Sequence, residues 1–175
     1  MSAKISINRA PVLTLWATVV CRRLGFTRDE ALTLGKAVAG LNAQSKGRRV
    51  GIFKPPEEKT TKARTKKHGE EFWVEVVGRP VPAKNTKDGV RAVIGDKAID
   101  PDDVQRYLES KFNDDLAAAE MAMMKLAKAL KPKDLAAEAY TLYERFRPRI
   151  PAGKKGWGAK GKLDLDLIAR LAKSS

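Results

Sequence analysis

The sequence predicts an α+β fold that is mainly helical, and three observations lead to this prediction. Apolar residues recur at helical spacing in the first 45 residues and again after residue 100. Between these parts, short stretches alternate apolar and polar side chains, as half-buried strands do. Apolar residues make up 43% of the chain and charged residues 32%, so the composition is that of a folded protein rather than a disordered one.

The N-terminal part is expected to be an αα-hairpin. Pro11 suits the first position of a helix, and Gly25 suits its end. Thr27 and Glu30 have the spacing of a capping box, in which a hydroxyl and a carboxylate bind free backbone N–H groups at a helix start. A second helix is therefore predicted to continue to about Asn42. The apolar face of the first helix is predicted to be Val12, Leu13, Trp16, Val19, Val20 and Leu24.

The middle of the chain predicts a small antiparallel β-sheet. Residues 71–77 alternate as a strand does, and Pro80 and Pro82 are expected to stop that strand. Gly95-Asp96 is a two-residue hairpin signal between apolar stretches at 90–94 and 97–99. These two stretches are therefore expected to pair.

The C-terminal half predicts helices separated by clear breakers. Asp100-Pro101 begins one helix, Asn113 is expected to cap the next, and Pro132 separates that one from a third, which Pro148 ends. A Gly- and Lys-rich loop at 148–163 then leads to a short last helix. The methionines at 121, 123 and 124 are expected to fill the core. The predicted organisation is a helical hairpin at 1–45, a basic arm at 46–70, and a sheet with helices at 71–175, which can pack with 1–45 as one domain.

The positive charge lies in two short segments. The chain has 35 Lys and Arg against 21 Asp and Glu, a net charge of +14. Residues 46–67 carry nine basic and two acidic side chains, and residues 145–162 carry seven basic and no acidic ones. Removing these from the totals leaves 19 basic and 19 acidic side chains, so the rest of the chain is neutral. Such a distribution favours a polyanionic partner, because flexible cationic segments displace the counterions of a phosphate backbone. The alternative is a pair of solvated charge runs.

Residues 153–162 form the most distinctive segment, because Trp157 lies among glycines and lysines. The glycines let backbone N–H groups approach phosphates, and the indole offers a face for a base or a groove. The alternative is a connector whose tryptophan packs on the body. The segment also spells G-x-x-x-x-G-K, but Leu163 stands where a P-loop needs Ser or Thr. Gly156, Gly158 and Gly161 also spell G-x-G-x-x-G, but a dinucleotide site requires a βαβ unit and an acidic residue about 20 positions later, and the sequence ends at Ser175.

We therefore expect a nucleic-acid-binding protein that acts through largely sequence-independent phosphate contacts, with double-stranded DNA favoured over RNA. The residues expected to bind are Lys46, Arg48, Arg49, Lys54, Lys62, Arg64, Lys66, Lys67, Arg147, Arg149, Lys154, Lys155, Trp157, Lys160 and Lys162. One alternative is a protein-interaction or scaffold subunit with basic arms. Another is an enzyme with an unrecognised carboxylate site. The apolar helix faces also allow a homodimer.

No residue pattern points to catalysis, a metal or a cofactor, and we expect none of them. His68 is the only histidine and Cys21 the only cysteine, so neither has a partner of its own kind for a metal site. Cys21 is expected to be a buried thiol rather than a nucleophile. The longest apolar stretch, residues 10–21, is shorter than the ~20 residues of a membrane span. Two arginines follow it directly, whereas a signal peptide has its charges before the apolar stretch and small residues after it. A cytoplasmic location is expected, with association to the nucleoid if the ligand is DNA.

Overall fold

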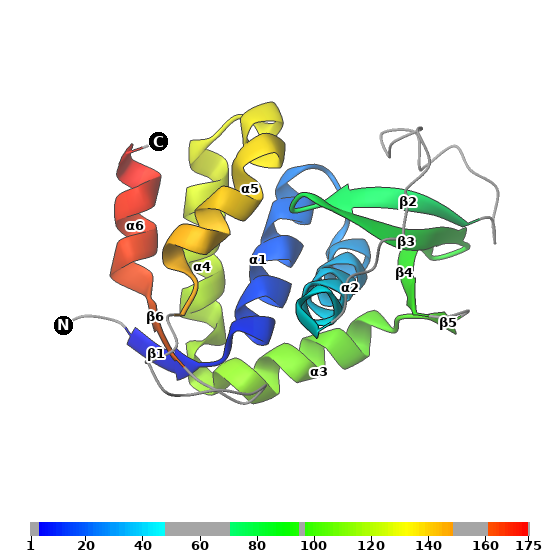
Figure 1. Ribbon diagram of the computed structural model, residues 1–175, viewed down its shortest axis with the longest axis horizontal. Coiled ribbons are helices and arrows are strands. Elements are labelled where there is room, and N and C mark those ends of the chain that lie inside the picture. Colours follow the sequence, from blue (N-terminus) through cyan, green and yellow to red (C-terminus); the bar gives the residue numbers. More distant parts are fainter. Residues whose placement is uncertain (1–3, 48–70, 95–96, 149–160, 175) are drawn as a thin grey trace.

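The computed structural model describes residues 4–47, 71–94, 97–148 and 161–174. The fold is α+β and mainly helical, as predicted (Figure 1). The helices are α1 (Arg9–Arg23), α2 (Arg28–Gly47), α3 (Pro101–Phe112), α4 (Leu116–Ala129), α5 (Pro132–Phe146) and α6 (Leu165–Ser174). The strands are β1 (Lys4–Ile7), β2 (Glu71–Val76), β3 (Arg79–Thr86), β4 (Gly89–Ile94), β5 (Lys97–Ala98) and β6 (Gly161–Asp164).

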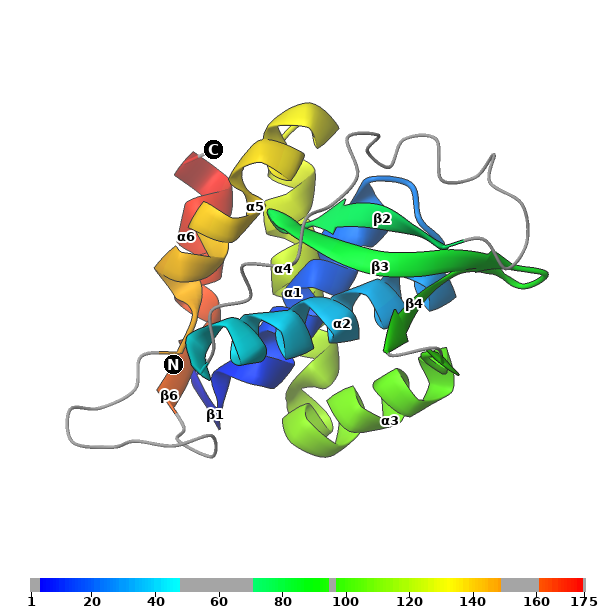
Figure 2. The ribbon, with the colours of Figure 1, turned by 45° about the vertical axis from the view of Figure 1, so that its right-hand side comes forward.

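Helix α1 is the centre of the molecule (Figure 1). Helix α2 and the four-stranded sheet lie on one side of it, α4, α5 and α6 lie on the other, and α3 passes along one end (Figure 1 and Figure 2). Every residue of α1 from Pro11 to Cys21 is buried, so the single apolar face predicted from periodicity was too narrow. Trp16 is fully buried, donates its indole N–H to the Ala139 carbonyl at 2.9 Å, and packs edge-on against Phe146.

Helix α1 begins two residues earlier than predicted, at Arg9. Pro11 is therefore the third residue of the helix, where its missing N–H still leaves no intrahelical hydrogen bond unmade. Helix α2 packs against α1 at Gly35. A Cβ atom there would lie 2.5 Å from Thr18 Oγ1 and 2.6 Å from the Thr14 carbonyl, so only glycine allows this close approach.

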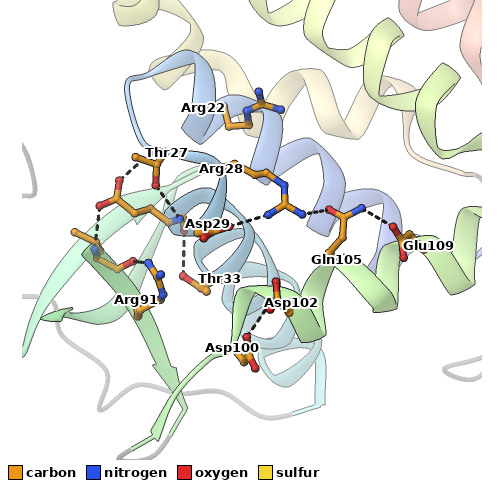
Figure 3. A network of polar contacts seen from close by, with 12 residues as sticks. Arg22, Thr27, Arg28, Asp29, Thr33, Arg91, Asp100, Asp102, Gln105 and Glu109 are labelled. Carbon is orange, nitrogen blue, oxygen red and sulfur yellow. Dashed lines mark hydrogen bonds and ion pairs between the residues drawn. The ribbon is translucent and has the colours of Figure 1, made fainter. Parts of the chain in front are cut away.

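The predicted capping box is present at the start of α2 (Figure 3). The backbone N–H of Thr27 donates to Glu30 Oε1 at 2.9 Å, and the backbone N–H of Glu30 donates to Thr27 Oγ1 at 3.2 Å. The second oxygen of the buried Glu30 carboxylate accepts the backbone N–H of Val90 at 2.9 Å. One turn later, Thr33 Oγ1 accepts the N–H of Ala92 at 3.1 Å. Side chains of α2 thus bind the backbone of β4 and join the helix to the sheet.

The sheet has the strand order β2-β3-β4-β5, and all neighbouring pairs are antiparallel. The predicted pairing of 90–94 with 97–99 is confirmed by Val93 opposite Ala98 and Ile94 opposite Lys97. The expectation that Pro80 and Pro82 stop the first strand was wrong. Strand β2 already ends at Val76, and both prolines lie within the next strand, β3.

The chain reverses at Val77-Gly78, which have φ angles of 48° and 77°, as a two-residue hairpin requires. Residue pairs in an antiparallel ladder alternate between hydrogen-bonded and non-hydrogen-bonded ones, and the Val76–Arg79 pair next to the turn is hydrogen-bonded. Pro80 and Pro82 therefore face β2 in pairs that exchange no hydrogen bonds. The pairing of β3 with β4 begins only at Ala83. The missing N–H groups of Pro80 and Pro82 are therefore not required on either side of the strand.

The C-terminal helices follow the predicted breakers except at Asn113. Asp100 caps α3 by accepting the N–H of Asp102 at 2.9 Å, and Pro132 is the first residue of α5. Asn113 does not cap α4. It ends α3 with a φ of 52°, a short 3-10 turn follows, and Asp115 precedes α4. Met123 lies in the core as expected, whereas Met121 is 61% exposed.

The sequence did not predict the two-stranded ribbon of β1 and β6. Here Ile5 lies opposite Leu163 and Ile7 opposite Gly161. The last residues of the predicted 148–163 loop are therefore strand. The ribbon brings β1 beside the start of α6, so the first and last described elements lie on the same side of the molecule (Figure 1).

Candidate nucleic-acid interface

Most of the predicted binding residues lie outside the described parts of the chain. Lys46 lies within α2, which extends five residues beyond the predicted end, and Arg147 and Lys162 lie on either side of the loop segment. The structure therefore describes the positions where the two basic segments leave and re-enter the fold. The predicted residues outside the described ranges are Arg48, Arg49, Lys54, Lys62, Arg64, Lys66, Lys67, Arg149, Lys154, Lys155, Trp157 and Lys160, and His68 lies outside them as well.

Segment 149–160 starts and ends at one place on the molecule, which we call the loop stem (residues 7–9, 147–148 and 161–162). At its start, the Pro148 carbonyl accepts a 2.7 Å hydrogen bond from Arg9 Nε. At its end, Gly161 pairs with Ile7, only two residues before Arg9. Residues of β1 and α1 thus hold Pro148 and Gly161, the described residues on either side of the segment.

Tyr143 lies beneath the loop stem and connects its two arginines. Its ring is buried, its hydroxyl donates to the Arg9 carbonyl over a long 3.5 Å, and the Arg147 guanidinium lies 5.8 Å from the ring centroid. Burial raises the pKa of Tyr143 to about 12, although the nearby Arg147 and Arg9 guanidinium groups act in the opposite direction. The hydroxyl therefore stays protonated at neutral pH.

The outer face of the β1–β6 ribbon carries Lys162 of the loop stem and, two residues further along the ribbon, Lys4 with Asp164 directly opposite it. Ile5, Ile7 and Leu163 point into the core, so the alternation of the strands turns Lys4 and Lys162 outward, and both are exposed. The ribbon carboxylate of Asp164 caps α6 by accepting the N–H groups of Asp166 at 3.0 Å and Leu167 at 3.3 Å. Within the described parts of the chain, Lys4, Lys162 and Arg147 form no ion pair with a carboxylate. The loop stem is therefore a basic surface.

Sequence reasoning missed Lys4 and Arg9, because neither belongs to a charged run. Only the pairing of β1 with β6 brings them to the loop. The alternation of Ile5 and Ile7 with Lys4 and Ser6 was a strand signal, but at four residues it was too short to identify a partner about 155 positions away.

Two arginines at the end of α1 contact residues in or next to α4. Arg23 donates to the Leu130 carbonyl at the end of α4 at 3.2 Å, and Arg22 lies 3.9 Å from the Glu120 carboxylate.

Cys21 is buried as expected. Burial, reinforced by the Glu30 carboxylate, raises the pKa of its thiol to about 12, so the thiolate needed for nucleophilic chemistry is disfavoured.

The described residues contain no cluster of three or more His, Cys, Asp or Glu side chains arranged for a metal ion. None of the described helices combines the length and apolar character required to cross a bilayer. No protein-family model, curated protein or solved structure matches this chain. The function is therefore inferred from the residues and geometry of this chain alone.

Proposed function

We propose that this protein binds nucleic acid, double-stranded DNA in preference to RNA, through phosphate contacts made by the 149–160 segment and its loop stem. The observation that carries the proposal is the stem itself. Arg9 and Ile7 hold the two ends of the segment together, and Lys4, Arg147 and Lys162 surround them with positive charge. A segment whose two ends are held by the fold loses less conformational entropy on binding than an arm with a free end does.

The distribution of charge supports the same function. The folded body is close to neutral, and the excess of +14 arises from residues 46–67 and 145–162. Cations gathered on one surface interact with the closely spaced phosphates of a duplex and release its condensed counterions. Trp157 adds an aromatic face for stacking or wedging in the same segment. We place such a protein in the cytoplasm, associated with the nucleoid.

Fluorescence anisotropy with a short labelled DNA duplex, repeated at several salt concentrations, tests the proposal. If the two basic segments make roughly six to ten phosphate contacts, affinity should fall by about 10³ to 10⁵ between 50 and 200 mM salt. Duplexes of different sequence should bind alike. A matching RNA hairpin used as competitor measures the expected preference for DNA.

Variants locate the contacts. Lys154→Ala with Lys155→Ala should make the salt slope shallower by about 2, and Lys162→Ala by about 1. Trp157→Ala should weaken binding by about 1–3 kcal/mol while leaving the melting temperature nearly unchanged. The matched control is Lys125→Ala with Lys128→Ala, which removes two exposed charges from α4 and should leave the slope unaltered. A nearly flat salt response of the wild-type protein, or equal slopes in loop and control variants, refutes this interface.

A further inference from the structure

A second cationic site lies between α2 and α3, away from the loop stem. The guanidinium of Arg28 holds the helices together by donating to Gln105 Oε1 at 3.0 Å, and Gln105 in turn donates to Glu109 at 3.1 Å (Figure 3). Two turns along α2, the Nζ atom of Lys36 lies 3.8 Å from the ring centroid of Tyr107 on α3. Lys36 is therefore held in place by its contact with the neighbouring helix.

A second ammonium group approaches the same ring. Lys111, one turn after Tyr107 on α3, has its Nζ atom 6.0 Å from the ring centroid. The two Nζ atoms are thus at most about 10 Å apart, because they lie 3.8 Å and 6.0 Å from the same ring centroid. Among the described residues, no carboxylate forms an ion pair with Lys36 or Lys111. Burial, and then the charge of Lys111, lower the pKa of Lys36.

A cation–π contact explains why one lysine lies on Tyr107, but it does not explain the second. Lys111 is at the outer limit of such a contact, and it repels Lys36. Folding alone gains nothing from two uncompensated like charges around one ring, whereas an anion placed between them interacts favourably with both. The arrangement is therefore better suited to a bound anion than to the empty protein.

The surface of α2 beside Lys36 is open. Gly40 follows Lys36 by one helical turn and is therefore on the same face. Unlike Gly35, it is exposed, and a Cβ atom built there would have no neighbour within 4 Å among the residues that the structure describes. Packing thus does not require a glycine here, although glycine is the weakest helix former after proline. Its effect is to leave the helix surface bare, so that a ligand can approach Lys36 from this side.

We propose that Lys36 and Lys111 bind a phosphate group between α2 and α3, with Tyr107 fixing the position of Lys36 and Gly40 leaving room for the ligand. Phosphate fits two lysines because it carries up to two negative charges and accepts hydrogen bonds from point-like ammonium donors. The site does not depend on the loop interface proposed above. The phosphate belongs either to a polynucleotide backbone or to a small phosphorylated molecule.

The test is a titration of the full chain with inorganic phosphate, followed by the NMR signals of the lysine ε-methylene groups. In the wild-type protein, the signals of Lys36 and Lys111 should shift at millimolar phosphate. Lys36→Met and Lys111→Met should each weaken binding by about tenfold or more, the usual effect of losing one charge-assisted hydrogen bond. Lys36→Arg, which retains the charge, should preserve binding, and Lys97→Met on the exposed strand β5 is the matched control.

Parallel DNA titrations identify the source of the phosphate. Weaker DNA binding in Lys36→Met and Lys111→Met, with a shallower salt slope, assigns the site to a polynucleotide backbone. Unchanged DNA binding combined with lost phosphate binding assigns it to a small phosphorylated ligand. If both variants bind phosphate and DNA as the wild-type protein does, or if the wild-type protein binds neither, the proposal is overturned. The loop variants Lys154→Ala and Lys155→Ala should leave the phosphate titration unaltered. Failure of the loop interface therefore does not imply failure of the site between α2 and α3, and the converse also holds.

Discussion

The Glu30 carboxylate is expected to be a main connection between the helical body and the sheet, and Glu30→Ala tests this. The side chain is 6% exposed, and each of its oxygens accepts one backbone N–H, from Thr27 and from Val90, both at 2.9 Å. Alanine leaves the buried Val90 N–H without its acceptor, which costs about 1–3 kcal/mol. It also removes half of the capping box, worth about 1 kcal/mol. The free energy of unfolding should therefore fall by about 2–4 kcal/mol.

Equilibrium unfolding in urea measures this loss, with the m-value checked for two-state behaviour. The control is Asp29→Ala, which removes the neighbouring first-turn acid and its surface ion pair with Arg28 and should change stability by about 1 kcal/mol or less. Amide exchange of Val90 should also accelerate more in Glu30→Ala than in the control. If Glu30→Ala unfolds within about 0.5 kcal/mol of the wild-type protein, the carboxylate does not join helix and sheet as described.

Two further predictions concern the core. Gly35→Ala should destabilise the protein by about 1–3 kcal/mol, because its Cβ would overlap Thr18 and the backbone of Thr14. Gly40→Ala, on the exposed surface of the same helix, should stabilise the protein by up to about 1 kcal/mol. Thermal unfolding measures both changes, and equal shifts in melting temperature would contradict the prediction. Because burial raises the pKa of Cys21 from 9.0 to about 12, its contribution to stability is fully present below pH 9 and is lost as the pH rises toward 12. Cys21→Ala should therefore make stability less dependent on pH in this range, by about 1.4 kcal/mol per pH unit, and identical pH profiles would refute the assignment.

The sequence predicted those parts of the fold that depend on neighbouring residues. The Thr27–Glu30 capping box, the Asp100 cap and the reversal after β4 are local signals, and all three are present. The ribbon of β1 and β6 could not be predicted, because its register depends on residues at opposite ends of the chain. The prolines of β3 misled the prediction, since their meaning depends on which edge of the strand needs N–H donors.

The candidate site was likewise predictable only where it depends on neighbouring residues. Composition located the charged segments, because unbalanced runs are visible without a structure. It could not identify Lys4 and Arg9 as their neighbours, since that relation arises from strand pairing. Nor could it identify the pair Lys36 and Lys111, which lie 75 positions apart and meet only because α3 packs on α2.

The separation of core and charge has a consequence for how this protein tolerates change. Among the described residues, every core residue except Phe146 lies outside the two basic segments, and neither Lys4 nor Lys162 contributes to that core. Removing charge from the stem should therefore alter binding with little effect on folding. Arg9 is the exception, because its side-chain Nε donates to the Pro148 carbonyl at the start of the loop. A change at Arg9 disturbs the position of the loop as well as the charge around it. Lys4 and Lys162 therefore report on phosphate contact, whereas Arg9 reports on how the loop is held.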